Sequence, residues 1–326
     1  MSDAVLRELK DGLLTLTLNK PELASFEFAL RFEYLVPAGL LYLLAHCCWG
    51  SFWVRLLHFE GVNVSWYAAL RAYFVSQFGK YIPGKGMVLV IRVGMLRPLG
   101  GRPLPVLVTA TYETLTNMAA GAMLGVLLLP MLGVLPVELS NNYYLLFGLA
   151  GLPVVLIAVN RIVVRIAMKS REPDAPSLPS PSVWLMAQGL VHGAVAYCLL
   201  GVSLGLTIRG VIPDAGIVGM SQFDPFTSLG NVGLVSLGYV AGFVILIAPG
   251  GLGPREFVYK ALLAPRFLSF LDADLSNGLA AVVALVLRLT WTAFEVLLAI
   301  VLYAKKPAHP TAMASTVAIG EEDVHA

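Results

Sequence analysis

"LIAPGGLGPREFVYKAL", residues 246–262, is the stretch that decides how this chain folds. An apolar run ends at a Pro-Gly-Gly triplet (249–251), a Gly-Pro pair (253–254) follows, and Arg255 and Glu256 come directly after it. Proline and glycine at this density interrupt a helix. The stretch therefore predicts two helical segments separated by a break, with two charged side chains placed beside it in apolar surroundings.

The composition is that of a membrane protein. Of 326 residues, 58% are hydrophobic and only 13% are charged, whereas soluble domains carry about 25% charged residues. A membrane helix needs roughly 17–25 apolar residues, and stretches of that kind lie at 36–57, 107–130, 143–159, 183–208, 229–249 and 279–303. We therefore expect an all-α, polytopic integral membrane helical bundle. The net charge of +2 is not gathered into a basic stripe, so no nucleic-acid partner is expected.

A second break resembles the first. It lies in "SQFGKYIPGKGMVLVIRVGMLR", residues 76–97, where a Pro-Gly pair interrupts the pattern and Arg92 follows. After each break comes a long apolar segment with one carboxylate inside it, Glu113 in the first case and Glu295 in the second. These matched features predict an internal repeat in which each half contains a re-entrant, broken-helix hairpin.

The repeat divides the chain into five parts. An N-terminal surface segment (1–35), which could form a helix lying on the membrane, is followed by a first membrane repeat (36–142). A connector helix with a Pro/Ser-rich cytoplasmic linker (143–182) then leads to a second membrane repeat (183–304) and a disordered tail (305–326).

The distribution of Lys and Arg predicts the topology. The basic loops 80–102 and 161–171 should be cytoplasmic, and the loop 131–142, with Glu138 as its charged residue, should be external. The two hairpins would then enter from opposite sides of the membrane, and inverted repeats with broken helices are typical of transporters. An alternative stays open, because 229–249 is long enough to cross completely, which would place the C-terminus outside.

The breaks and the charges point to an anion site. Backbone without helical hydrogen bonds is tolerated at membrane depth only inside protein or around a watery cavity, so both breaks are predicted to line a cavity. A helix N-terminus after each break attracts an anion, and the guanidinium of Arg255 matches a phosphate. Arg288, Glu113 and Glu295 would cost roughly 7–10 kcal/mol together if they were unpaired in the membrane. They must therefore pair or face water.

A purely structural reading of these charges is the alternative. Arg255 and Glu256 could simply form an ion pair that holds helices together, and Glu256 could simply complement its helix N-terminus. Lys80 is interpreted as a determinant of topology rather than a ligand. The Gly-x-Ser-x-Gly pattern at 201–205 lies in an apolar helix without the strand–turn–helix context of a nucleophile, so no catalytic residue is assigned.

The two breaks resemble the lysylphosphatidylglycerol synthase transmembrane-region family. The first motif stands as GKYIPGK (79–85), followed by Arg92 and Glu113, and the second as PGGLGPRE (249–256). The resemblance covers about 36–303, and the second motif is the more specific one. It implies a flippase-like membrane protein of the bacterial cytoplasmic membrane.

The last helix extends the resemblance through Arg288 and Glu295, and two departures limit it. Family members usually have another spanning helix before 36–57, where this chain is short and charged. No aminoacyl-transferase domain follows the membrane region, so lysyl transfer from tRNA is not implied. Stand-alone members resemble transporters of lipids or lipid-linked glycans.

The sequence thus predicts a flippase that moves an anionic phospholipid or a lipid-linked intermediate between leaflets, without a cofactor or metal. Arg255 and Arg92 would bind phosphate, while Arg288, Glu113 and Glu295 would line the path, balance charge or bind a cationic headgroup. The candidate substrate-binding residues are Lys85, Arg92, Glu113, Pro249, Gly250, Gly251, Gly253, Arg255, Glu256, Arg288 and Glu295. Two alternatives remain: an accessory subunit that anchors a biosynthetic enzyme such as a glycosyltransferase, and a membrane enzyme acting on a lipid-linked sugar.

Overall fold

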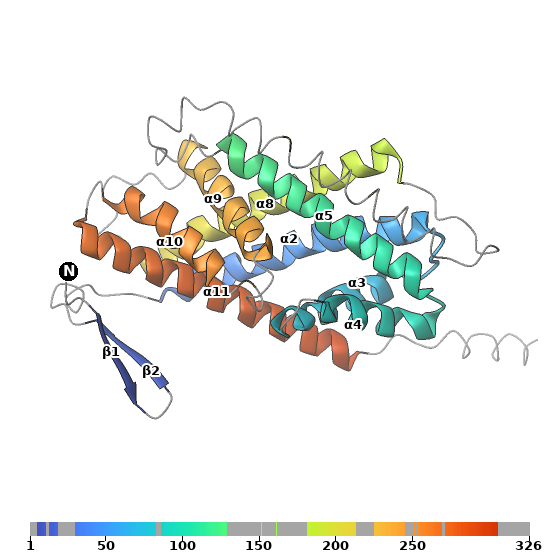
Figure 1. The fold of residues 1–326 in the computed structure, drawn as a ribbon, viewed down its shortest axis with the longest axis horizontal. Helices are drawn as coiled ribbons and strands as arrows, with labels where there is room; N and C mark the ends of the chain where they lie inside the picture. The colour runs from blue at the N-terminus through green and yellow to red at the C-terminus, as the bar shows by residue number, and fades with distance from the viewer. Residues whose placement is uncertain are drawn as a thin grey trace, which may run out of the picture.

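The computed structural model of the chain is shown in Figure 1. It describes residues 5–10, 13–18, 30–82, 86–128, 151, 161, 181–212, 225–244, 251, 253–268 and 271–305. The predicted connector 143–159, the external loop 131–142, most of the linker 168–182 and the tail after residue 305 lie outside the described residues.

Three of the described helices are long and apolar enough to cross a membrane: α2 (Phe32–Phe59), α8 (Val183–Val211) and α11 (Ala273–Ala304). They contain three of the predicted spans. The apolar surface of α11 is largely open, since the aliphatic side chains of Leu285, Leu289, Leu297 and Ile300 are more than half exposed. Such a stripe is unfavourable in water but is satisfied by lipid, which agrees with a helical membrane protein.

Helix α5 (Pro103–Leu128) replaces the predicted span 107–130. It is long, but its apolar character falls short of the three helices above. Glu113, Asn117 and Thr116 are buried on it, so its polar residues face protein rather than lipid.

Residues 5–10 and 13–18, the described part of 1–29, do not form the surface helix that the sequence suggested. Two strands, β1 (Val5–Lys10) and β2 (Leu13–Leu18), pair antiparallel with Val5 opposite Leu18. The reason lies in the Leu-Thr-Leu-Thr-Leu alternation of 14–18, which has the two-residue period of a strand and contains β-branched threonine.

The first break lies in the sequence between two short helices, α3 (Trp66–Ser76) and α4 (Met87–Leu96). Helix α3 is capped by Ser65, whose hydroxyl accepts from the Ala68 N–H at 3.2 Å. It runs into the 3₁₀ turn η1 (Gln77–Tyr81), and α4 and the turn η2 (Arg97–Leu99) follow. A Cβ at Gly79 would overlap the backbone of Val88. Glycine at this position lets η1 and α4 approach each other closely.

The second break separates α9 (Pro225–Val244) from α10 (Pro254–Phe267), which pack against each other. Gly251 and Gly253 both have positive φ, +72° and +90°, which only glycine adopts without strain. Pro254 occupies the first turn of α10, where its missing N–H costs nothing. Glycine thus occupies the two described positions of positive φ in this break, and proline occupies the first turn of the helix that follows.

The helices pack around a centre formed by α2 and α8, which lie side by side (Figure 1). Helices α5 and α11 each contact both of them. The two broken pairs lie outside this centre: α9 packs against α5 and α8, and α3 packs against α11 and α2. The regions around the breaks are therefore held between helices of both halves of the chain.

Candidate functional site

A cavity of about 380 Å³ lies between the two breaks. Gly86, at the end of the first break, and Gly251, in the second, both line it. The charged side chains in its wall come from both halves of the chain: Lys80, Arg92, Glu113 and Arg255. The structure therefore brings together residues that are up to 175 positions apart in sequence (80 to 255).

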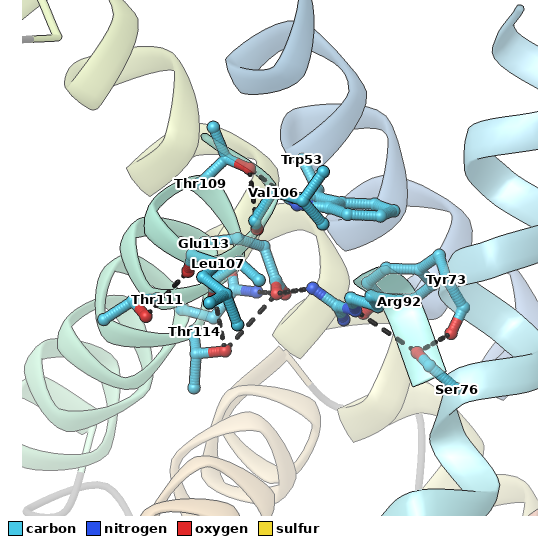
Figure 2. Close-up of polar contacts among 12 residues, drawn as sticks. Trp53, Tyr73, Ser76, Arg92, Val106, Leu107, Thr109, Thr111, Glu113 and Thr114 are labelled. Carbon is cyan, nitrogen blue, oxygen red and sulfur yellow. Dashed lines mark hydrogen bonds and ion pairs between the residues drawn. The ribbon is translucent and has the colours of Figure 1, made fainter. Parts of the chain in front are cut away.

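Arg92 and Glu113 form a buried ion pair, drawn in Figure 2. Arg92 Nη1 donates to Glu113 Oε2 at 3.0 Å, and Arg92 Nε donates to the Ser76 hydroxyl at 3.2 Å. Asn117 Nδ2 donates to the other carboxylate oxygen at 2.6 Å, and the Thr114 hydroxyl lies 3.4 Å from Oε2. Both oxygens of the carboxylate therefore have donors.

Aromatic rings hold the same guanidinium on its faces. Arg92 Cζ lies 4.5 Å from the ring centroid of Trp53 and 4.6 Å from that of Tyr73. Figure 2 shows Trp53 on one side of Arg92, with its indole N–H directed at the Thr109 hydroxyl, 3.2 Å away. The sequence assigned Arg92 to phosphate. The structure gives its guanidinium a carboxylate, a hydroxyl and two rings instead.

Glu295 has a partner that the sequence analysis did not consider. Lys80 Nζ lies 2.5 Å from Glu295 Oε2, and the hydroxyl of Tyr42 donates to the same oxygen. Lys80 was interpreted as a determinant of topology, but it lines the cavity. No short-range pattern could have revealed this pair, because η1 and α11 are far apart in the chain. Burial lowers the pKa of Lys80, and the neighbouring Glu295 carboxylate opposes that effect.

Arg255 is held differently from Arg92. It is 8% exposed, and its guanidinium lies over the ring of Tyr239, with Cζ 3.8 Å from the centroid. It packs beside Gly242, where a side chain would crowd Nε. Its Nε is buried without a hydrogen-bond partner, and in the part of the chain that the structure describes no carboxylate pairs with this guanidinium.

The purely structural alternative predicted an ion pair between Arg255 and Glu256, and the structure does not contain this pair. Glu256 Oε2 accepts from the N–H of Gly253 at 2.7 Å and closes the first turn of α10. Its Oε1 lies 3.9 Å from Nε of Arg288, a long contact with a partly exposed carboxylate. Glu256 therefore caps the helix, and Arg255 is directed into the cavity.

Three predicted site residues, Lys85, Pro249 and Gly250, lie outside the described residues. The structure also adds residues that the sequence had not singled out for the site. His46, Trp49, Tyr73 and Tyr239 all line the cavity. They come from three helices at irregular spacing, so only their side-chain packing identifies them.

His46 lies on α2 and contacts tyrosines of α2 and α9. Its Nδ1 lies 3.0 Å from the Tyr42 carbonyl and its Nε2 lies 3.4 Å from the Tyr239 hydroxyl. These distances suit a neutral ring that donates from Nδ1 to the carbonyl and accepts from the tyrosine at Nε2. In the described residues no group of three His, Cys, Asp or Glu side chains is placed to hold a metal ion.

Comparison with models of known protein families finds no match, and comparison with curated proteins finds none either. The function must therefore be argued from the site. The described charges in the cavity wall are three cations and one carboxylate, with Glu295 behind Lys80. Two cations are neutralised by carboxylates and one, Arg255, is not. The arrangement favours the binding of one anion.

Proposed function

We propose that this protein is a membrane transporter of the flippase type, which binds the anionic headgroup of a phospholipid or lipid-linked intermediate in the cavity and passes it between leaflets. The observation that carries the proposal is the buried guanidinium of Arg255, which faces the cavity and has no carboxylate partner among the described residues.

A buried cation without a counter-charge is unfavourable, so a site of this kind gains free energy when an anion enters. A guanidinium offers a planar set of donors that matches phosphate oxygens. The N-terminus of α10 begins one residue before Arg255 and contributes its dipole to the same place. These groups together favour a phosphate-bearing ligand.

The rest of the cavity wall favours an amphipathic ligand. Apolar side chains such as Val88, Leu89, Met118 and Phe243 share it with the charged groups. A free inorganic anion would not use this apolar wall, whereas the glycerol backbone and the first acyl carbons of a lipid would.

The packing of the helices supports two equivalent halves. If α2, α3, α4 and α5 are exchanged with α8, α9, α10 and α11, each contacting pair becomes another contacting pair: α5 with α9 becomes α11 with α3, and α2 with α5 becomes α8 with α11. This pattern is expected of a repeat. We propose that it is an inverted one, in which the two broken pairs move against the centre and expose the cavity to each leaflet in turn.

The positions of the broken pairs agree with that proposal. Helix α3 lies at the C-terminal end of α11, where Arg71 donates to the carbonyls of Leu302 and Tyr303. Helix α10 precedes α11 in the chain and lies toward its N-terminal end (Figure 1). The two pairs therefore lie toward opposite ends of the last spanning helix.

The test is a leaflet-accessibility assay in proteoliposomes. Acyl-labelled phosphatidylglycerol and acyl-labelled phosphatidylcholine are compared as anionic and zwitterionic probes, and a membrane-impermeant quencher reports the outer leaflet. Arg255→Gln removes the proposed headgroup ligand. Arg55→Gln is the matched control, because Arg55 lies on α2, hydrogen bonds to Gln188 and does not line the cavity.

We expect movement of phosphatidylglycerol by wild type and Arg55→Gln, and a loss of at least about tenfold in Arg255→Gln, since hydrogen bonds to a charged group contribute roughly 1.5–3 kcal/mol. Equal rates for Arg255→Gln and wild type would rule out the proposed site. Size-exclusion profiles establish that the variants fold.

A further inference from the structure

The Lys80–Glu295 pair spans the wall of the cavity. Lys80 lines the cavity and its side chain is 19% exposed, whereas Glu295 is 2% exposed and lies behind it. The lysine can therefore reach a ligand in the cavity, but the carboxylate cannot. An anion that enters competes with Glu295 for the same ammonium group.

Lys80 and Arg255 are directed at one cavity and repel each other electrostatically. An anion between them relieves that repulsion and accepts hydrogen bonds from both. Lys80 has a long, flexible stem, so it can exchange its partner without movement of the backbone of η1. The anion site proposed above would then have two cationic ligands, Arg255 and Lys80.

Departure of Lys80 leaves Glu295 in an unfavourable state. The Tyr42 hydroxyl still donates to Oε2, but Oε1 is buried and has no hydrogen-bond partner among the described residues. The other groups that act on this carboxylate come from four elements: Tyr81 from η1, His46 from α2, Tyr73 from α3 and Tyr239 from α9. Arg255 and Arg288 act on the pair through Lys80. A buried carboxylate that loses its cation is neutralised by a proton.

Glu113 does not have this property. Its cation, Arg92, is held by Ser76 and by the rings of Trp53 and Tyr73, and both of its oxygens have donors. An entering anion would have to break these contacts of Arg92 before Glu113 lost its cation. The exchange is therefore confined to the second carboxylate.

We propose that Glu295 is a proton-binding site coupled to the anion site through Lys80, so that each anion is bound together with one proton from the solvent. The inference rests on the proposed function and adds its coupling ion. When the anion takes Lys80, the O–H bond forms at Oε1 of Glu295; when the anion leaves, the proton returns to water and the ion pair reforms. One negative and one positive charge enter together, so the loaded site keeps the net charge of the empty one.

Binding and proton uptake can be measured together on the purified full-length chain in detergent. The probe is dihexanoyl-phosphatidylglycerol, whose phosphodiester does not titrate near neutral pH, and dihexanoyl-phosphatidylcholine is the zwitterionic control. A pH indicator in weakly buffered solution reports protons, and calorimetry reports binding. For wild type we expect about one proton taken up for each lipid bound, and an affinity that rises by up to about tenfold for each unit that the pH falls.

The variants separate the roles of the residues. Glu295→Gln should bind the lipid without proton uptake and with little dependence on pH. Lys80→Gln should bind several-fold more weakly and also without uptake, because its Glu295 is already protonated before the lipid arrives. Arg55→Gln, which lies outside the cavity, is the control that should keep both binding and uptake. Proton uptake that persists in Glu295→Gln would overturn the assignment.

Binding by wild type without proton uptake would overturn the coupling and leave the proposed function intact. Absence of binding by wild type would overturn both.

Discussion

Glu113 and Glu295 lie on long helices of the two halves of the chain, α5 and α11, but their surroundings differ. Glu113 pairs at 3.0 Å with Arg92 from the same half, and hydroxyl, amide and aromatic groups surround the pair. Glu295 instead takes Lys80 from the other half and keeps one oxygen without a partner. Arg255, the arginine of the second half, faces the cavity over Tyr239.

Under the proposed function, the difference separates a structural site from a binding site. The Arg92–Glu113 pair has donors on both carboxylate oxygens and joins α4 to α5, which pack against each other. A guanidinium that is buried without an ionic partner does little for folding and much for an incoming anion. We propose that the same residue types have opposite roles in the two halves of the chain, and the substitutions below test this comparison.

The largest effect is expected for the satisfied pair. Arg92→Met leaves the buried Glu113 carboxylate without its cation, so we expect a loss of about 3–5 kcal/mol in the free energy of unfolding. Chemical unfolding in mixed micelles measures it. The double variant Arg92→Met/Glu113→Leu should recover much of the loss, because neither charge of this pair is left buried without its partner. A loss below about 1 kcal/mol in the single variant would mean that the pair does not support the fold.

Arg255→Gln is the matching change in the second half. We expect a free energy of unfolding that is unchanged or raised, since the variant removes a buried charge that has no ionic partner among the described residues. We also expect its affinity for dihexanoyl-phosphatidylglycerol to fall by about 10–100-fold. Unfolding and calorimetric binding on one preparation give both values. Destabilisation as large as that of Arg92→Met would erase the distinction between the two arginines.

The two breaks differ in backbone strain as well. Gly253 has φ +90° with open space around a built Cβ, so Gly253→Ala should cost about 1–2 kcal/mol from backbone conformation alone. Gly86 precedes α4 with φ −68° in the ordinary helical region, and Gly86→Ala should cost less than about 0.5 kcal/mol in the same unfolding assay. Equal costs would show that the backbone at 253 relaxes freely.

The smallest effect concerns the cap of α10. Glu256→Ala removes the acceptor of the Gly253 N–H, and we expect a loss of about 0.5–1 kcal/mol. Glu256→Gln is the control, because its amide oxygen can still accept this hydrogen bond. Thermal unfolding of the two variants side by side measures the difference. A result in which Gln destabilises as much as Ala would assign the effect to charge instead of the hydrogen bond.

Local features of the chain could be predicted from the sequence where a residue acts through its own backbone. The first-turn position of Pro254, directly after Gly253, and the long apolar helices α2, α8 and α11 are examples. The N-terminal strands were missed although the Leu-Thr alternation in 14–18 indicates them.

The pairing of charges could not be predicted in the same way. The sequence singled out Arg92, Glu113, Arg255 and Glu295 because charges are costly in apolar segments, but that argument does not say which cation meets which carboxylate. Lys80 and Glu295 are separated by 215 positions, and the Tyr239 ring under Arg255 belongs to another helix. Partner choice depends on how helices pack, which no local period encodes.

By itself, the sequence determined that the chain is apolar, helical and interrupted, because the transfer of apolar side chains and the conformational limits of proline and glycine are properties of single residues. Only the tertiary structure decided that Gly86 and Gly251 line one cavity, that Arg92 is closed off by Glu113 and that Arg255 is left to face that cavity. Electrostatic energies depend on distances between groups from different helices, and those distances exist only once the helices have packed.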